Sequence, residues 1–132
     1  MSEENNHRVQ MYRSILITAI EGGINYWARV LHYNPDMNTD TLPFYFGDEC
    51  RAVVVEDEDG AESKTIDTAT IRKAMSKLSK GGGYRPDGTA PEWWTKKWRK
   101  AYKECADGSW DFDASDADTV VQVAIFGEVV YG

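Results

Sequence analysis

Residues that bind metals or carry redox chemistry are scarce in this sequence of 132 residues. Its two cysteines, Cys50 and Cys105, lie far apart, and its two histidines are His7 and His32. Zinc sites use clustered Cys and His ligands, and that spacing is absent here. The sequence therefore predicts no metal site and no cofactor, and we expect both cysteines to be buried or half-buried thiols.

Long apolar runs are also missing. The longest uncharged apolar run, from Ile15 to Ile20, has six residues, whereas a membrane span needs about twenty. The acidic start, Met1-Ser2-Glu3-Glu4, lacks the basic and apolar regions of a signal peptide. We therefore expect a cytoplasmic protein without a membrane partner.

Known catalytic signatures are absent as well. The sequence contains no Walker loop, no Gly-x-Ser-x-Gly elbow and no His-Glu-x-x-His helix. Carboxylates crowd the stretch from Asp107 to Asp118, but counted from Asp111 the positions where a calcium loop needs Gly and Glu hold Asp116 and Gln122. The sequence therefore indicates a solvated acidic loop with helix-capping residues, and it predicts no catalytic residue.

What is present is the composition of a folded domain. Hydrophobic residues make up 42% of the chain and charged residues 28%, which is close to the average of globular proteins. We expect one domain over residues 1–132, in which the polar and unpatterned residues 1–7 are flexible.

Charge is distributed unevenly along the chain. The net charge of −7 argues against sequence-specific binding of nucleic acid. From Lys64 to Glu104, however, there are eleven basic residues and four acidic ones, while the rest of the chain has four basic and eighteen acidic residues. This segregation predicts a basic face on an acidic body, which could select a small anion. The alternative is that the opposite charges pair within the fold.

Hydrophobic periodicity predicts a helix and a strand in the first part of the chain. Apolar residues at three- and four-residue spacing from Val9 to Ile20 predict a helix that ends at Gly22-Gly23. Alternation from Ile24 to Leu31 predicts a strand. Asn34-Pro35-Asp36 then predicts a turn, and the polar residues to Asp40 a loop.

A hairpin is predicted next, in which the β-branched residues from Cys50 to Glu56 form one strand and Ser63 to Ile66 the other. Asp67 or Thr68 is expected to cap a helix that Gly81-Gly82-Gly83 stops. Pro91 is expected in the first turn of a further helix, running through Glu104.

The last predicted element begins near Ser115, which forms a capping-box pattern with Asp118. Its apolar residues continue to Ile125, and their β-branched character leaves a strand as the competing prediction. The order of elements predicts an α+β fold, a small single domain with an antiparallel sheet and three to four helices. We expect the first helix and the chain after Asp118 to pack together.

One candidate ligand site is the string Glu21-Gly22-Gly23-Ile24-Asn25-Tyr26-Trp27. Its glycines would let a ligand approach the backbone, Tyr26 or Trp27 could stack on a flat ring, and Glu21 or Asn25 could hydrogen-bond a base edge. The alternative is that the glycines end a helix while Tyr26 and Trp27 fill the core.

A second candidate is the string from Trp93 to Lys100, which interleaves aromatic and cationic residues as surfaces that stack bases do. Trp94 and Trp98 share a face with Tyr102, so the alternative is an amphipathic helix with solvated lysines. Trp93 falls outside that face, and we expect it to be exposed. Trp93, Lys97 and Arg85 are the candidate contacts from this part of the chain.

Two strings at opposite ends of the chain resemble a known family. Residues 17–27, ITAIEGGINYW, and residues 118–132, DTVVQVAIFGEVVYG, are similar to the ends of a small phage-encoded protein family of unassigned activity. The resemblance implies a viral or prophage origin and action in a bacterial cytoplasm. In role, proteins of this kind are similar to phage counter-defence factors, including sponges that sequester nucleotide immune signals.

These observations lead to three hypotheses. The first is a counter-defence binding protein that holds a small nucleotide-like ligand without turning it over. Such a protein could also form a homo-oligomer. The second is an acidic inhibitor that imitates nucleic acid and binds a host protein. The third is a nucleotide-processing enzyme that uses carboxylates such as Glu21 and Glu128.

Overall fold

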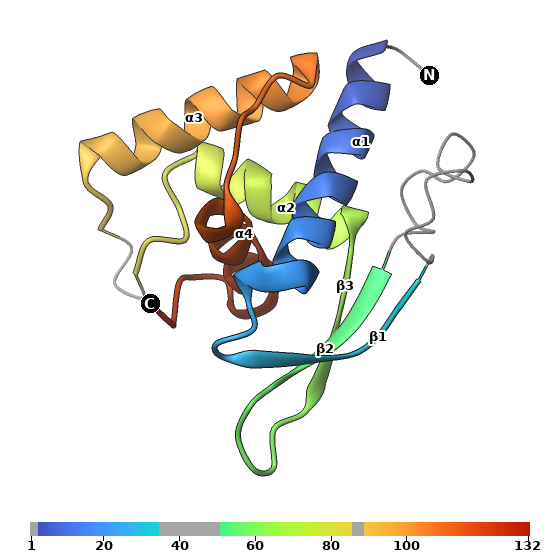
Figure 1. Ribbon diagram of the computed structural model, residues 1–132. Helices are drawn as coiled ribbons and strands as arrows, with labels where there is room; N and C mark the ends of the chain where they lie inside the picture. The colour runs from blue at the N-terminus through green and yellow to red at the C-terminus, as the bar shows by residue number, and fades with distance from the viewer. Residues whose placement is uncertain (1–2, 35–50, 86–88) are drawn as a thin grey trace.

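The computed structural model describes residues 3–34, 51–85 and 89–132. Four α-helices, one π-helical turn and three strands lie in these ranges (Figure 1). The first part of the chain forms α1 (Glu3–Thr18), the π-helical turn η1 (Ala19–Gly23), β1 (Ala28–Asn34), β2 (Arg51–Glu56) and β3 (Ser63–Asp67). The remainder forms α2 (Thr68–Ser79), α3 (Glu92–Asp107) and α4 (Ala114–Phe126). The predicted α+β fold is therefore confirmed.

The three strands form an antiparallel sheet in the order β1-β2-β3. β2 and β3 form the predicted hairpin, whose turn contains Gly60 at a φ of 82°. The register between β1 and β2 shifts at a bulge between Val30 and His32. The helices lie to one side of this sheet, and α3 lies at the end of the molecule away from the hairpin turn (Figure 1).

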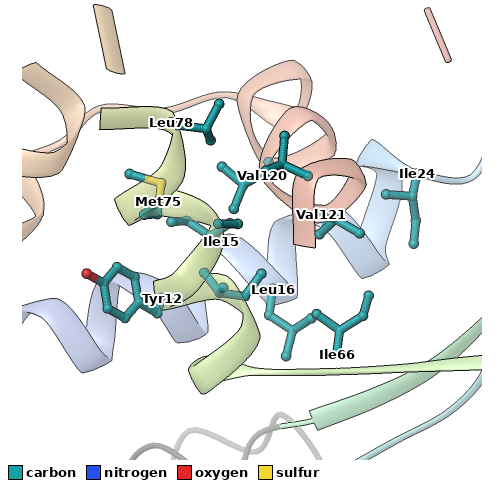
Figure 2. Close-up of a cluster of buried hydrophobic side chains, with 14 of the residues drawn as sticks. Tyr12, Ile15, Leu16, Ile24, Ile66, Met75, Leu78, Val120 and Val121 are labelled. Carbon is teal, nitrogen blue, oxygen red and sulfur yellow. The ribbon is translucent and has the colours of Figure 1, made fainter. Parts of the chain in front are cut away.

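A single hydrophobic cluster joins the helices to the inner face of the sheet. α1 contributes Ile15 and Leu16, and α4 contributes Val121, all of them fully buried. Figure 2 shows these side chains with Met75 of α2 and Ile66 of β3 gathered between the elements. The expected packing of the first helix against the chain after Asp118 is confirmed.

The helix boundaries follow from capping side chains. Asp67 caps α2 as expected, because its carboxylate accepts from Thr70 N while the Thr70 hydroxyl accepts from Asp67 N. α4 is capped in the same way by Asp113 and Asp116, so the prediction of a cap at Ser115 was wrong. The pair Asp113 and Asp116 and the pair Ser115 and Asp118 both have the capping-box spacing. The side chain of Asp118, however, is buried inside the molecule.

The prediction of a loose terminus over residues 1–7 was wrong for residues 3–7, which are helical. This end of α1 has no apolar periodicity because it meets α3 through polar groups. His7 Nδ1 lies 3.2 Å from Ala106 O, and Arg8 donates to Tyr102 O. Polar contacts of this kind leave no hydrophobic pattern in the sequence.

The predicted strand from Ile24 was also wrong in its first four residues. Ile24 O accepts from Trp27 N and from Ala28 N, which folds residues 24–27 into a turn, so β1 begins only at Ala28. Ile24 itself is fully buried. The turn and loop expected over residues 35–40, and Cys50, lie outside the described residues.

Among the described residues, no helix combines the length and the apolar content that crossing a membrane would require.

Candidate functional site

The glycine pair at the end of the first helix allows a close approach of two helices. Gly23 lies in η1 against the start of α4, where a Cβ atom would stand 2.8 Å from Ala114 O. Only glycine fits such a contact without a shift of backbone. Gly22 meets nothing within 4 Å, so space is not the reason for the second glycine. The turn thus brings residues 24–27 beside α4.

A buried carboxylate lies where this turn meets α4. Asp118 is only 8% exposed, and it accepts hydrogen bonds from Trp27 Nε1 at 2.7 Å, from Tyr26 Oη at 2.5 Å and from Gln122 Nε2 at 3.0 Å. Hydrogen bonds to an ionised acceptor are stronger than neutral ones. We name Tyr26, Trp27, Asp118, Gln122 and Tyr131 the Asp118 cluster.

Gln122 connects this carboxylate to the segment after α4. Its Oε1 accepts from Val130 N and Tyr131 N, both at 2.7 Å, and its Nε2 also donates to Tyr131 O at 3.1 Å. A buried amide must satisfy both its donor and its acceptor sites. Here both kinds of site form hydrogen bonds with the backbone of residues 130–131.

The ring of Tyr131 completes the Asp118 cluster. It lies parallel to Trp27, with ring centroids 5.1 Å apart and planes 9° apart, and its hydroxyl hydrogen-bonds Glu56. Trp27 is 4% exposed and also contacts Phe126. The face of Trp27 that was predicted to stack on a ligand is therefore occupied by a residue of the same chain.

The two tyrosine hydroxyls of the cluster are held in the neutral form. Burial, followed by the hydrogen bond to Asp118, raises the pKa of Tyr26 from 10.0 to about 12. The hydrogen bond to Glu56 is the main reason why the pKa of Tyr131 also rises to about 12. Both phenols therefore act as hydrogen-bond donors to carboxylates at neutral pH.

The remaining candidates of the first string point outward. Glu21 and Asn25 are exposed, and the ring of Tyr26 is exposed although its hydroxyl reaches Asp118. The alternative interpretation, that aromatic residues of this string fill the core, is right for Trp27. The hydrogen bonds and the ring stacking of the Asp118 cluster connect the two strings on which the family resemblance rests.

The second candidate region is the exposed side of α3. The buried side of this helix is formed by Trp94, Trp98, Ala101 and Cys105. On the opposite side, Trp93, Lys96, Lys100 and Lys103 follow one another at spacings of three, four and three residues, which places them in one stripe. We name these four residues the α3 face. Trp93, exposed as predicted, begins the stripe.

Trp93 is held in place although its ring is 57% exposed. Its edge contacts are to Tyr84, with centroids 6.2 Å apart, and to Trp94, at 5.8 Å. The guanidinium of Arg85 lies 4.9 Å from the centre of the Tyr84 ring. Three of the predicted ligand contacts were Arg85, Trp93 and Lys97, and of these Arg85 and Trp93 both contact Tyr84.

Lys97 has a structural partner. Its Nζ lies 2.8 Å from Asp116 Oδ1, at the capping box of α4. Lys96 also has an ion-pair partner, Glu92, but both side chains are more than 70% exposed, and such pairs contribute little. Within the described residues Lys100 and Lys103 make no ion pair, so their charges are available at the surface.

A hollow of about 780 Å³ lies at the far end of the α3 face, between α3 and the start of α1. Lys100 and Lys103 line one part of it, and the remaining lining residues are His7, Arg8, Glu104, Ala106 and Asp107. The Arg8 guanidinium is fixed by its bond to Tyr102 O and lies 4.3 Å from the centre of the Tyr102 ring. The hollow therefore has an ordered cationic wall.

The two candidate regions reach different sides of α4. Tyr26 and Trp27 contact the side chain of Asp118, whereas Lys97 contacts the side chain of Asp116. Residues two apart on a helix point in nearly opposite directions. The structure therefore keeps Glu21, Asn25, Tyr26 and Trp27 apart from Arg85, Trp93 and Lys97, and we treat the α3 face as the candidate site.

Few groups with reactive chemistry are found. Burial raises the pKa of the Cys105 thiol to about 12, so this thiol stays protonated and unreactive, as expected of a buried cysteine. No group of three His, Cys, Asp or Glu side chains that could hold a metal ion occurs in residues 3–34, 51–85 and 89–132.

Sequence reasoning missed the roles of Gln122 and Tyr131. One signal was present, because Asp118 and Gln122 are polar residues four apart within the valine-rich α4, where helical spacing places them on one side.

Comparison with protein-family models, curated proteins and solved structures found no match for this chain.

Proposed function

We propose that this protein binds a small anionic ligand with a planar aromatic ring, a nucleotide in the first place, on the α3 face. The observation that carries the proposal is the exposed ring of Trp93, fixed at the start of a row of lysines. Stacking of a base on an aromatic side chain contributes about 1–3 kcal/mol. The ammonium groups of the row would neutralise phosphate.

The fixed position of Trp93 supports this role. A mobile side chain loses rotational freedom when a ligand binds, which reduces affinity by about 0.5–1.5 kcal/mol per side chain. Edge contacts to Tyr84 and Trp94 already restrict the ring. The exposed indole is thereby presented to solvent beside the Tyr84 ring, over which the guanidinium of Arg85 lies.

The chemistry of the α3 face favours binding over turnover. Lysine ammonium groups, a guanidinium and an indole attract and stack a nucleotide, whereas hydrolysis needs a positioned base, nucleophile or metal ion. With the resemblance to phage-encoded proteins, this supports sequestration of a nucleotide immune signal in an infected bacterium. The acidic remainder of the chain would keep long nucleic acids away.

The proposal is tested by calorimetric titration of the full chain with single nucleotides. We expect binding that Trp93→Ala weakens by about five- to a hundredfold, corresponding to about 1–3 kcal/mol of stacking. Lys100→Glu should weaken it as well. Tyr33→Ala removes an exposed aromatic ring from β1, and Lys64→Glu reverses an exposed charge on β3, so both serve as matched controls.

After binding, the complex is denatured and the released ligand is identified by chromatography. Unchanged ligand agrees with sequestration, whereas a product in excess over the protein would identify an enzyme. Binding that is equally strong in the Trp93→Ala variant and the Tyr33→Ala control would contradict the assignment of the site.

A further inference from the structure

We propose that the ligand of the α3 face is a short oligonucleotide rather than a single nucleotide. This inference rests on the proposed function and concerns the length and charge of the ligand. It starts from the extent of the stripe, which begins at Trp93 and continues to Lys103 at the rim of the hollow.

The dimensions of the stripe exceed those of one nucleotide. With a rise of 1.5 Å per residue, Lys96, Lys100 and Lys103 lie about 4, 10 and 15 Å from Trp93 along the helix axis. A nucleic-acid strand in B-form advances 3.4 Å per nucleotide, so 15 Å corresponds to about four stacked nucleotides, or fewer in an extended strand. A ligand with one base on Trp93 therefore needs about two to four nucleotides to reach Lys103.

The hollow determines what charge the far end of the ligand carries. Its wall presents Lys100, Lys103 and the fixed guanidinium of Arg8, but the carboxylates of Glu104 and Asp107 line it as well. Three cations and two carboxylates leave this wall with one net positive charge, which a single phosphodiester balances and a triphosphate exceeds. The hollow therefore suits phosphodiesters, which carry one charge each, better than a triphosphate group.

An upper limit on ligand length follows from the surroundings of the stripe. After Lys103 the next charged residues of α3 are Glu104 and Asp107, and the carboxylates of both line the hollow. A strand that extends beyond the hollow meets this negative potential, and its further phosphates gain nothing. We therefore expect affinity to rise with length and then to reach a plateau.

The test titrates the full-length protein with single-stranded oligothymidylates of one to eight nucleotides, with adenosine triphosphate for comparison. We expect affinity to rise up to about four nucleotides and to stay constant beyond, and log K to fall with log salt by about 0.7 per phosphate contacted. The triphosphate should bind more weakly than the tetranucleotide.

Variants separate the two ends of the stripe. Lys103→Glu should weaken binding of the tetranucleotide by about tenfold and binding of the mononucleotide by clearly less, since only the longer ligand reaches the hollow. Trp93→Ala should weaken both ligands, and Lys64→Glu neither. Thermal unfolding of each variant, equal to that of the unmodified protein, shows that the exposed substitutions leave the fold intact.

The two proposals fail in different ways. If mononucleotide and tetranucleotide bind equally and both depend on Trp93, the oligonucleotide inference is wrong while the binding function stands. A triphosphate that binds as tightly as the tetranucleotide also overturns the inference. If none of the probes binds, both proposals are overturned.

Discussion

Asp118 is a carboxylate that neutral donors hold inside the molecule. An indole N–H and a phenol from the turn of residues 24–27 and an amide from α4 surround it. Such a group couples local chemistry to stability, because a buried donor that loses its acceptor costs about 1–3 kcal/mol. The contribution of Asp118 to the free energy of unfolding can therefore be measured by replacing one of its carboxylate oxygens, as in the Asn variant.

We predict that Asp118→Asn destabilises the protein by about 1–3 kcal/mol. The substitution removes the charge and replaces one acceptor oxygen by an N–H₂ group, whereas Oδ2 now accepts from Tyr26 and Oδ1 from Trp27 and Gln122. The measurement is urea unfolding followed by fluorescence, with Asp111→Asn, at an exposed position, as the control. Equal stability of the two variants would contradict the role given to Asp118.

The neutral phenols of Tyr26 and Tyr131 predict how stability responds to alkaline pH. Both have a pKa near 12 in the folded protein, against 10.0 as the ordinary value, so the folded state binds their protons more tightly. Their contribution is complete below pH 10 and is lost as the pH rises toward 12.

We therefore expect the free energy of unfolding to decrease over this alkaline range. Urea unfolding at increasing pH measures the decrease, and it should be smaller in Tyr131→Phe, which loses the Tyr131 contribution but retains those of Tyr26 and of the buried Cys105 thiol. A free energy of unfolding that stays constant between the two pKa values would show that these hydroxyls are not held as described.

At the scale of secondary-structure elements, glycines determine how closely the helices approach. Gly83, after α2, has a φ of 86°, and its carbonyl accepts from Val129 N. A Cβ atom there would stand 2.9 Å from a methyl group of Val123 in α4. Gly60, in the hairpin turn, has a similar φ of 82° but nothing within 4 Å.

We predict that Gly83→Ala destabilises the protein more than Gly60→Ala. Both variants bear the penalty of a positive φ, about 1–2 kcal/mol. Only Gly83→Ala adds overpacking against α4, which costs about 1–3 kcal/mol more. Thermal unfolding of the two variants measures the difference, and equal losses would mean that α4 shifts without cost.

The elements that could be predicted from the sequence are those decided by local interactions. The cap of α2, expected at Asp67 or Thr68, and the hairpin of β2 and β3 depend on neighbours within a few residues, and both were predicted. The cap of α4 was placed two residues too late because the segment contains two fitting patterns. The start of β1 was missed because burial of Ile24 in the core folds the next residues into a turn.

The candidate site could be predicted only where helical periodicity reveals it. Trp93 was expected to be exposed because it falls outside the apolar stripe of α3, and it is. The occupation of Trp27 by Tyr131 could not be predicted, because their contact joins opposite ends of the sequence and leaves no local pattern. For the same reason the ion pair of Lys97 with Asp116 was missed.

At the scale of the whole molecule, the core is continuous from the helices to the sheet. Within the described residues its members come from all four helices and from β1, β2 and β3, so that these elements share one core. The basic residues of α3 lie on its outer side, where they do not interrupt this core. Stability is therefore a property of the whole arrangement.

We predict one cooperative unfolding transition. Far-ultraviolet circular dichroism, which reports the helices, and tryptophan fluorescence, which reports the cluster around Trp98 and Trp27, should give coincident curves in urea. Val121→Asp places an unpaired charge in the core and should shift both curves together, while Val130→Asp, at an exposed position, should shift neither much. Separate midpoints for the two probes would contradict a single core.

The stacking contact between Trp27 and Tyr131 has a consequence for the synthesis of the chain. A ribosome that has just made Trp27 must add about one hundred further residues before Tyr131 exists, which takes roughly 5 to 20 s. Until Asp118 has been made, the indole lacks the carboxylate that accepts its hydrogen bond. Until Tyr131 has been made, it also lacks its stacking partner. The nascent chain therefore exposes an apolar surface that only the arrival of α4 and the segment after it can cover, and this part of the fold forms after translation of nearly the whole sequence.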